Sequence, residues 1–151
     1  MANFHRHRAD LVLEQARAIL RGAFDAARAR DLKPMTAVVL DAGGHPVAME
    51  REDGAGIARF EVARGKAWGA LGVGMASGTF GAANVERPAF LGAVSAATDG
   101  MTVPVAGGVL VLNGDGEIIG AVGVSGDASD ADEAVAVAGI EAAGLAAGAS
   151  D

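Results

Sequence analysis

The first candidates for chemistry are basic residues on one predicted helix, Arg59, Arg64 and Lys66. A cation from this set would hold the carboxylate of a small organic acid, because hydrogen bonds between charged groups are short and strong. Gly107 and Gly108 are expected to form the facing wall of that cleft, which makes all five residues candidate ligand-binding positions. The alternative is that these charges form the solvated face of an amphipathic helix.

An enzyme acting on a small organic acid or carbonyl compound is one interpretation of this set. Such an enzyme needs a general base near the bound carbonyl group. No spacing in the chain selects one carboxylate for that role. The candidates are Glu50, Glu52, Glu61 and Asp99.

The three histidines are the candidate metal ligands. His5 and His7 lie near the N-terminus, and His45 precedes Pro46 in a predicted turn. Haem needs an axial ligand, an apolar slot and cations near its propionates, so each histidine is a candidate axial ligand. The alternative is that two are solvated tail residues and the third only a turn residue. The chain has no cysteine, which excludes disulfides and thiolate ligands.

The stretch "AVGVSGDASDADEA", residues 121–134, predicts a strand that runs directly into an acidic helix start. Carboxylates suit the positive end of a helix and oppose the binding of an anion there. Ser129 and Asp132 have the spacing of a capping box. No Gly-Lys-Ser/Thr follows, and the ligand alternation of a calcium loop is missing. The stretch therefore predicts a helix cap.

Composition predicts one folded domain over residues 1–151, because 51% of the residues are hydrophobic and 21% are charged. The net charge of -7 makes nucleic acid a poor partner. No apolar run is long enough for a membrane span, and the N-terminus lacks a signal-type hydrophobic run, so we expect a cytoplasmic protein. Residues 1–7 and 148–151 are expected to be disordered.

Hydrophobic periodicity and turn signals predict an α+β fold in the order α-ββ-α-α-ββ-α. The two hairpins carry a repeated turn, in which Asp41 matches Asn113 and Gly44 matches Gly116, and they are expected to join into one antiparallel sheet. The glycine-rich residues 72–84 predict a mobile connection, or a segment whose backbone closely approaches a ligand or partner. The tail "EAAGLAAGASD" predicts a fraying helix end. The helices are predicted at about 8–30, 57–76, 86–97 and after residue 128.

Three separated motifs resemble the GlcG/HbpS family of small haem-binding or haem-degrading-type proteins, which also includes the C-terminal domain of PduO-type proteins. They are "VVLDAGGHPVAMEREDGA", "ARGKAWGAL" and "VPVAGGVLVLNGDGEIIGAVGVSGDASDADEAVA". The resemblance implies a profilin-like α/β sandwich, a homo-oligomer, and haem or a similar planar or carboxylated ligand.

The chain departs from the family pattern at two places. It has Gly107-Gly108-Val109-Leu110 where family members often have Gly-Gly-x-Pro, and "MASGTFGAANVERPAF" is less typical. The pocket walls are therefore expected to differ. A non-catalytic oligomeric accessory protein is the remaining interpretation, favoured by the alanine and glycine content, which lets elements pack closely.

Overall fold

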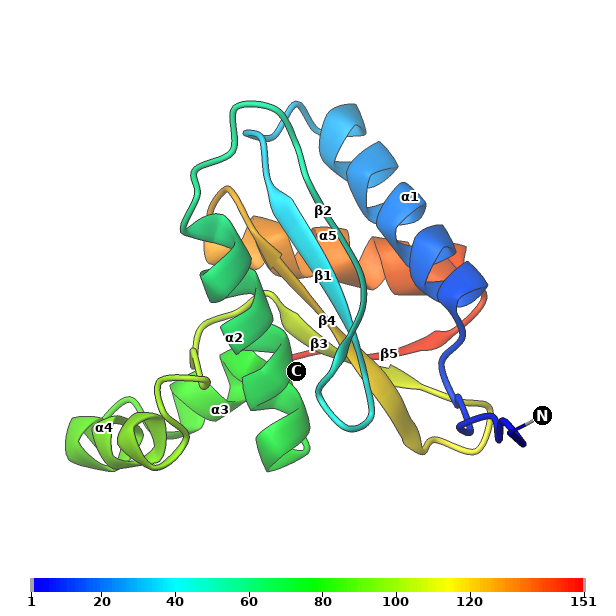
Figure 1. Cartoon of the computed structure of the whole chain (residues 1–151). Coiled ribbons are helices and arrows are strands. Elements are labelled where there is room, and N and C mark those ends of the chain that lie inside the picture. Colours follow the sequence, from blue (N-terminus) through cyan, green and yellow to red (C-terminus); the bar gives the residue numbers. More distant parts are fainter. Residues whose placement is uncertain (1, 151) are drawn as a thin grey trace.

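The fold of residues 2–150, seen in a computed structural model, is a five-stranded antiparallel sheet between two helical layers (Figure 1). The strand order is β2-β1-β4-β3-β5, so the two predicted hairpins join through the pairing of β1 with β4. No helix among the described residues is long and apolar enough to span a membrane. The elements are α1 Leu13–Ala29, β1 Thr36–Asp41, β2 Pro46–Arg51, α2 Arg59–Val73, α3 Ser77–Ala83, α4 Pro88–Ala97, β3 Gly108–Leu112, β4 Ile118–Ser125, α5 Ser129–Ala142 and β5 Ala146–Gly148.

The two faces of the sheet carry different side chains. Helices α1 and α5 cover one face with large aliphatic residues such as Ile19 and Ile140, which pack against Val122. Helix α2 covers the other face mainly with alanines, including Ala63 and Ala67. Because successive residues of a strand point to opposite faces, Ala121 and Gly123 of β4 face α2, whereas Val122 and Val124 face α1 and α5. Helix α2 can therefore pack closely against the sheet, because only small side chains lie between them.

The two hairpin turns are structurally equivalent, as the repeat predicts. Asp41 Oδ1 accepts backbone N–H groups from Gly43 and His45 at 2.9 and 3.0 Å. Asn113 Oδ1 accepts N–H groups from residues 115 and 117, both at 2.9 Å. Gly44 and Gly116 have φ values of 82° and 78°, a conformation that glycine adopts without steric cost. The predicted order of helices and hairpins is confirmed, with α3 and β5 added.

Helix α3 lies inside the glycine-rich segment, so the prediction of a mobile connection there is wrong. The glycines serve close packing instead. A Cβ atom on Gly81 would overlap the carbonyl oxygen of Pro104, and one on Gly78 would lie 2.6 Å from Ser150 Oγ. The alternative expectation was that the backbone of this segment closely approaches a ligand or partner. The backbone does make a close approach, but to Pro104 and Ser150 of the same chain.

The C-terminal tail is not a fraying helix end. Helix α5 ends at Ala142, and β5 then pairs antiparallel with β3 through Leu110, Val111 and Leu112. Ser150 donates its N–H and its hydroxyl to Glu133, at 2.8 and 3.1 Å. The strand pairing and these bonds hold residues 148–150 in place, so the expected disorder is not seen there. Asp151, for which disorder was also expected, lies outside the described residues.

The N-terminal helix begins later than predicted. Residues 2–12 form no helix or strand and are mostly exposed, and α1 starts at Leu13, because Gln15 Oε1 accepts the N–H of Val12 at 3.0 Å and caps the helix there. Helix α2 ends at Gly74, whose φ of 73° is the left-handed conformation of a helix C-terminus.

Candidate functional site

Lys66 lies in the protein interior, with 2% of its surface exposed. Its Nζ donates to the carbonyl oxygen of Val124 and to Asp132 Oδ2, each at 3.0 Å. The pair joins α2, on one face of the sheet, to the first turn of α5, on the other. Lys66 therefore has its charge balanced within the protein, and it offers no free cation to a ligand carboxylate.

The start of α5 has no side-chain cap from Ser129, and Asp132 instead ties the helix to the residue before its N-cap. The N-cap residue is Ala128, and Ser129 makes no capping bond because it is already the first residue of the helix. Asp132 Oδ1 accepts the N–H of Asp127 at 2.9 Å. Asp127 in turn accepts the N–H of Lys33 at 2.9 Å, and this bond lowers the pKa of Asp127. The predicted capping box of Ser129 and Asp132 is therefore wrong, because Ser129 is not the N-cap residue and Asp132 bonds to residue 127.

Replacing Ser129 with alanine is expected to change the free energy of unfolding by less than about 0.5 kcal/mol, the usual range for a half-buried surface side chain that makes no capping bond. A true N-cap serine would cost about 1 kcal/mol on the same replacement. Urea unfolding of both proteins measures the difference. A loss of about 1 kcal/mol or more would show that the Ser129 hydroxyl caps the helix after all.

The other basic candidates do not converge on a shared site. Arg59 Nη1 donates to Ser125 Oγ at 3.3 Å, and Arg64 Nη2 contacts Met101 Sδ at 2.6 Å. They point to different neighbours because the helix turns by about 100° per residue. The structure therefore separates Arg64 from the end of β4, where Arg59 and Lys66 both bond.

Gly107 and Gly108 lie directly against Lys66, as expected. A Cβ atom on Gly107 would lie 2.9 Å from Lys66 Nζ, and one on Gly108 would overlap the Lys66 carbonyl group. The contact leaves no room for a ligand between the helix and the strand. None of the five candidate ligand-binding residues lines either of the two cavities described below.

The first cavity, here called the histidine cavity, has a volume of about 520 Å³. It lies between the N-terminal segment, residues 7–13, and the β1–β2 turn. His7 and His45 both line it although they are far apart in the sequence, and Arg8 adds a cation, whereas His5 is not part of the wall. The apolar wall consists of Leu11, Val12, Leu13, Pro46, Val47 and Ile119.

His45 has a suitable arrangement for a metal ligand. Its side chain is 80% exposed, and its Nδ1 lies 3.4 Å from Asp41 Oδ1. A carboxylate beside one ring nitrogen favours the proton there and leaves the other nitrogen, Nε2, as an acceptor. The same carboxylate shapes the turn through its two backbone bonds. The turn therefore fixes the partner that orients the imidazole.

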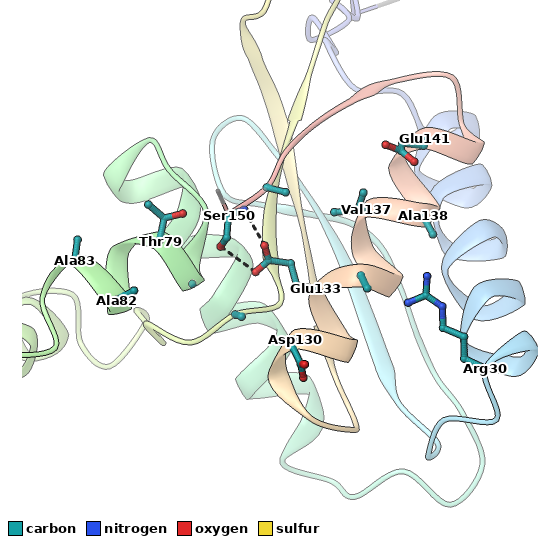
Figure 2. A pocket seen from close by; sticks show the side chains of 14 residues that line it. Arg30, Thr79, Ala82, Ala83, Asp130, Glu133, Val137, Ala138, Glu141 and Ser150 are labelled. Carbon is teal, nitrogen blue, oxygen red and sulfur yellow. Dashed lines mark hydrogen bonds between the residues drawn. The ribbon is translucent and has the colours of Figure 1, made fainter.

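The second cavity, here called the groove, runs between α3 and α5 and has a volume of about 830 Å³ (Figure 2). Its wall is largely apolar, with Ala82 and Ala83 on one side and Val137 and Ala138 on the other. Three carboxylates, Asp130, Glu133 and Glu141, and one cation, Arg30, also line it. Sequence reasoning did not find the groove, because its walls meet only through tertiary packing.

Glu133 is the buried carboxylate of the groove. It accepts the two bonds from Ser150 described above and a third from the N–H of Gly107, at 3.3 Å. Figure 2 shows its side chain pointing to Ser150. From the sequence, Glu133 is only one of the carboxylates at the positive end of the predicted helix, and nothing in the sequence links it to residue 150. In the structure, Glu133 holds the C-terminal segment.

The histidine cavity suits haem better than the groove. Haem propionates are anions and need cations nearby, and the iron needs an axial ligand. The groove has no histidine and three carboxylates to one arginine, so it repels a propionate. The histidine cavity has two imidazoles and apolar walls, and its charged side chains are one guanidinium, Arg8, and two carboxylates, Asp10 and Asp41. Within residues 2–150, the histidine cavity included, no three or more His, Asp or Glu side chains form a group that could hold a metal ion by themselves.

The fold and the sequence are similar to those of known proteins. A profile for haem degrading, HbpS-like proteins matches residues 11–141. A solved PduOC–haem complex is 26% identical, with a TM-score of 0.80 over 91% of this chain and 97% of that one. HbpS is 27% identical, with a TM-score of 0.74 over 91% of this chain and 92% of that one. No curated protein matches the chain significantly.

The fold extends to more distant proteins. Klebsiella pneumoniae protein ORFY is 21% identical, with a TM-score of 0.81 over 95% of this chain and 97% of that one, which shows a shared fold. The molecule is thus an α+β sandwich with one antiparallel sheet, of the kind shared by these proteins. Its sequence places it more narrowly: the chain belongs to the HbpS-like family of haem degrading proteins.

Proposed function

We propose that the protein binds haem in the histidine cavity, with His45 as an axial ligand. The observation that carries the proposal is the pairing of His45 Nδ1 with Asp41, at 3.4 Å, on the wall of a cavity that also contains His7. Metal-bound histidines usually present their second ring nitrogen to such a carboxylate, which fixes the tautomer and raises the basicity of the ligand.

The other walls of the cavity supply the remaining requirements. Leu11, Pro46 and Ile119 exclude water from one side of a planar ligand, and Arg8 on the same wall would have to exchange its exposed pairing with Asp10, at 2.8 Å, for a propionate. The volume of about 520 Å³ is in the usual range for a small-molecule site. His7 is the candidate for the second axial position. Haem bound there would supply a redox-active iron atom.

The relatives support this ligand class. One solved neighbour, at 26% identity, is a complex of PduOC with haem, and the family is described as haem degrading. Binding of a small organic acid at Lys66 has less support, because Asp132 and Val124 already take up the Lys66 ammonium group. Haem binding is therefore the function that the cavities and the family favour together.

Titration with haemin tests the proposal. The unaltered protein is expected to give a saturable, shifted Soret band with one haem per chain. Loss of a residue that only orients a metal ligand typically weakens metal binding by roughly 10- to 100-fold. His45→Ala removes the ligand itself, so it is expected to weaken haem binding by at least this factor. Asp41→Asn is expected to weaken it by a smaller factor, because it removes only the orienting carboxylate.

His5→Ala is the matched control, because His5 is a tail histidine outside the cavity wall. Its titration curve is expected to match that of the unaltered protein. His7→Ala is expected to change the position of the Soret band if His7 is the second ligand. Equal titration curves for His45→Ala and His5→Ala, or a broad non-saturating spectrum with the unaltered protein, would contradict the proposal.

A further inference from the structure

The groove between α3 and α5 carries negative charge that the chain does not neutralise. Its three carboxylates, Asp130, Glu133 and Glu141, all come from α5. Its one cation, Arg30, comes from the C-terminal end of α1. None of these four side chains forms an ion pair within residues 2–150. The groove therefore attracts cations, and the net charge of -7 on the whole chain acts in the same direction.

Glu133 has the strongest need for a positive partner, because only 8% of its surface is exposed. All three of its hydrogen bonds come from neutral groups, the N–H of Gly107 and the N–H and hydroxyl of Ser150. Buried charges in proteins are normally paired with an opposite charge. An ionised carboxylate also accepts about four hydrogen bonds, so Glu133 can accept one more. A cationic donor in the groove would supply both the charge and the bond.

The carboxylates are spread along the groove and do not gather at one point. Asp130 lies in the first turn of α5 and Glu141 in the last, which separates their backbones by about 16 Å at the usual rise of a helix. Between them, Val137 and Ala138 give the same wall an apolar stretch (Figure 2). Within residues 2–150 no three carboxylates are close enough to hold a metal ion. The wall therefore suits an elongated ligand with separated positive charges.

We propose that the groove binds a linear aliphatic polyamine, which lies along α5. Such a molecule alternates ammonium groups with methylene chains, the same order of charge and apolar surface that the α5 wall presents. One ammonium group would pair with Glu133 and Asp130, and another with Glu141, while the methylene groups pack against the apolar stretch. The alanines of α3 close the opposite side. The volume of about 830 Å³ is in the usual range for a small-molecule site.

Titration calorimetry of the full chain with spermine, which has four amine groups, tests the proposal. The ionic strength is set at about 0.15 M, where attraction between distant surface charges is largely screened. The unaltered protein is expected to bind one spermine per chain with a saturable curve. Hexylamine has a single ammonium group and is expected to bind at least about tenfold more weakly, because it loses one charged pairing. Mg²⁺ at the same concentration of positive charge is expected not to displace spermine.

Variants of the exposed groove residues test the charge match without disturbing the bonds to Ser150. The double variant Asp130→Asn/Glu141→Gln is expected to raise the dissociation constant of spermine by about tenfold, because two exposed ion pairs are lost. Arg30→Gln removes the competing cation and is expected to lower that constant by about two- to fivefold. Asp53→Asn is the matched control, since Asp53 is an exposed carboxylate outside the groove. Its dissociation constant is expected to stay unchanged.

Ala138→Phe tests the shape of the groove at constant charge. A phenyl ring there fills the space between α3 and α5, so spermine is expected to bind at least about tenfold more weakly. Unaltered spermine binding in Ala138→Phe, equal losses in Asp53→Asn and Asp130→Asn/Glu141→Gln, or displacement of spermine by Mg²⁺ would each show only a general attraction to an acidic protein and overturn the proposal. No saturation by about 1 mM spermine, a concentration typical of weak contacts, would overturn it as well.

Discussion

Replacing Lys66 with methionine is expected to lower the free energy of unfolding by about 3–5 kcal/mol, the usual cost of removing one partner of a buried ion pair. The loss arises because Asp132, with 1% of its surface exposed, would keep a carboxylate in the interior without its cation. Asp132→Asn is expected to cost a similar amount, since it leaves the Lys66 ammonium group with only the Val124 carbonyl as a partner. Urea unfolding followed by circular dichroism measures both changes.

The double variant Lys66→Met/Asp132→Asn separates the contribution of the ion pair from the contributions of its two members. Removing both charges leaves no buried ion, so the double variant is expected to lose clearly less than the sum of the two single changes. Arg8→Met is the matched control, because Arg8 pairs with Asp10 at 2.8 Å while its side chain is 87% exposed. An exposed pair contributes at most about 1 kcal/mol. A cost for Lys66→Met as small as that for Arg8→Met would contradict the buried pair.

The fold was predictable where local signals were strong. The repeated turn around Asp41 and Asn113 fixed both hairpins, because a side-chain acceptor and a glycine with positive φ specify the turn on their own. Helix α3 and strand β5 were missed for the opposite reason. Their residues are mostly glycine and alanine, whose local preferences are weak, and both elements form because other parts of the chain pack on them.

The partners of the candidate site residues could not be predicted from the sequence. Lys66 sits in a basic sequence context, and that context indicates an exposed helix face or a ligand cation. Its true partner, Asp132, is 66 positions away, and no local pattern connects the two. His7 and His45 are similarly distant, and they share a cavity only because the N-terminal segment passes the β1–β2 turn. Residue types suggested the chemistry, whereas the convergence of the side chains depended on the tertiary fold.

The contact between α2 and β4 predicts a second large effect, from a single added methyl group. Gly123 lies in β4 under α2, and a Cβ atom there would overlap the backbone carbonyl of Ala63 and lie 3.0 Å from Ala67 Cβ. Gly123→Ala would force α2 away from the sheet, because a backbone carbonyl inside a helix cannot move alone. We expect a loss of about 3 kcal/mol, at the upper end for an overpacked core.

Thermal unfolding measures this loss, which corresponds to a decrease in Tm of about 6–12 °C for a domain of this size. Gly114→Ala is the matched control, since a Cβ on Gly114 has no atom within 4 Å and its φ is outside the positive region. That change is expected to leave Tm unchanged or to raise it slightly, because alanine restricts the unfolded chain. If both variants melted within about 2 °C of the unaltered protein, less than 1 kcal/mol would separate them. Such a result would mean that α2 does not pack on β4 as closely as the backbone positions of Ala63 and Gly123 require.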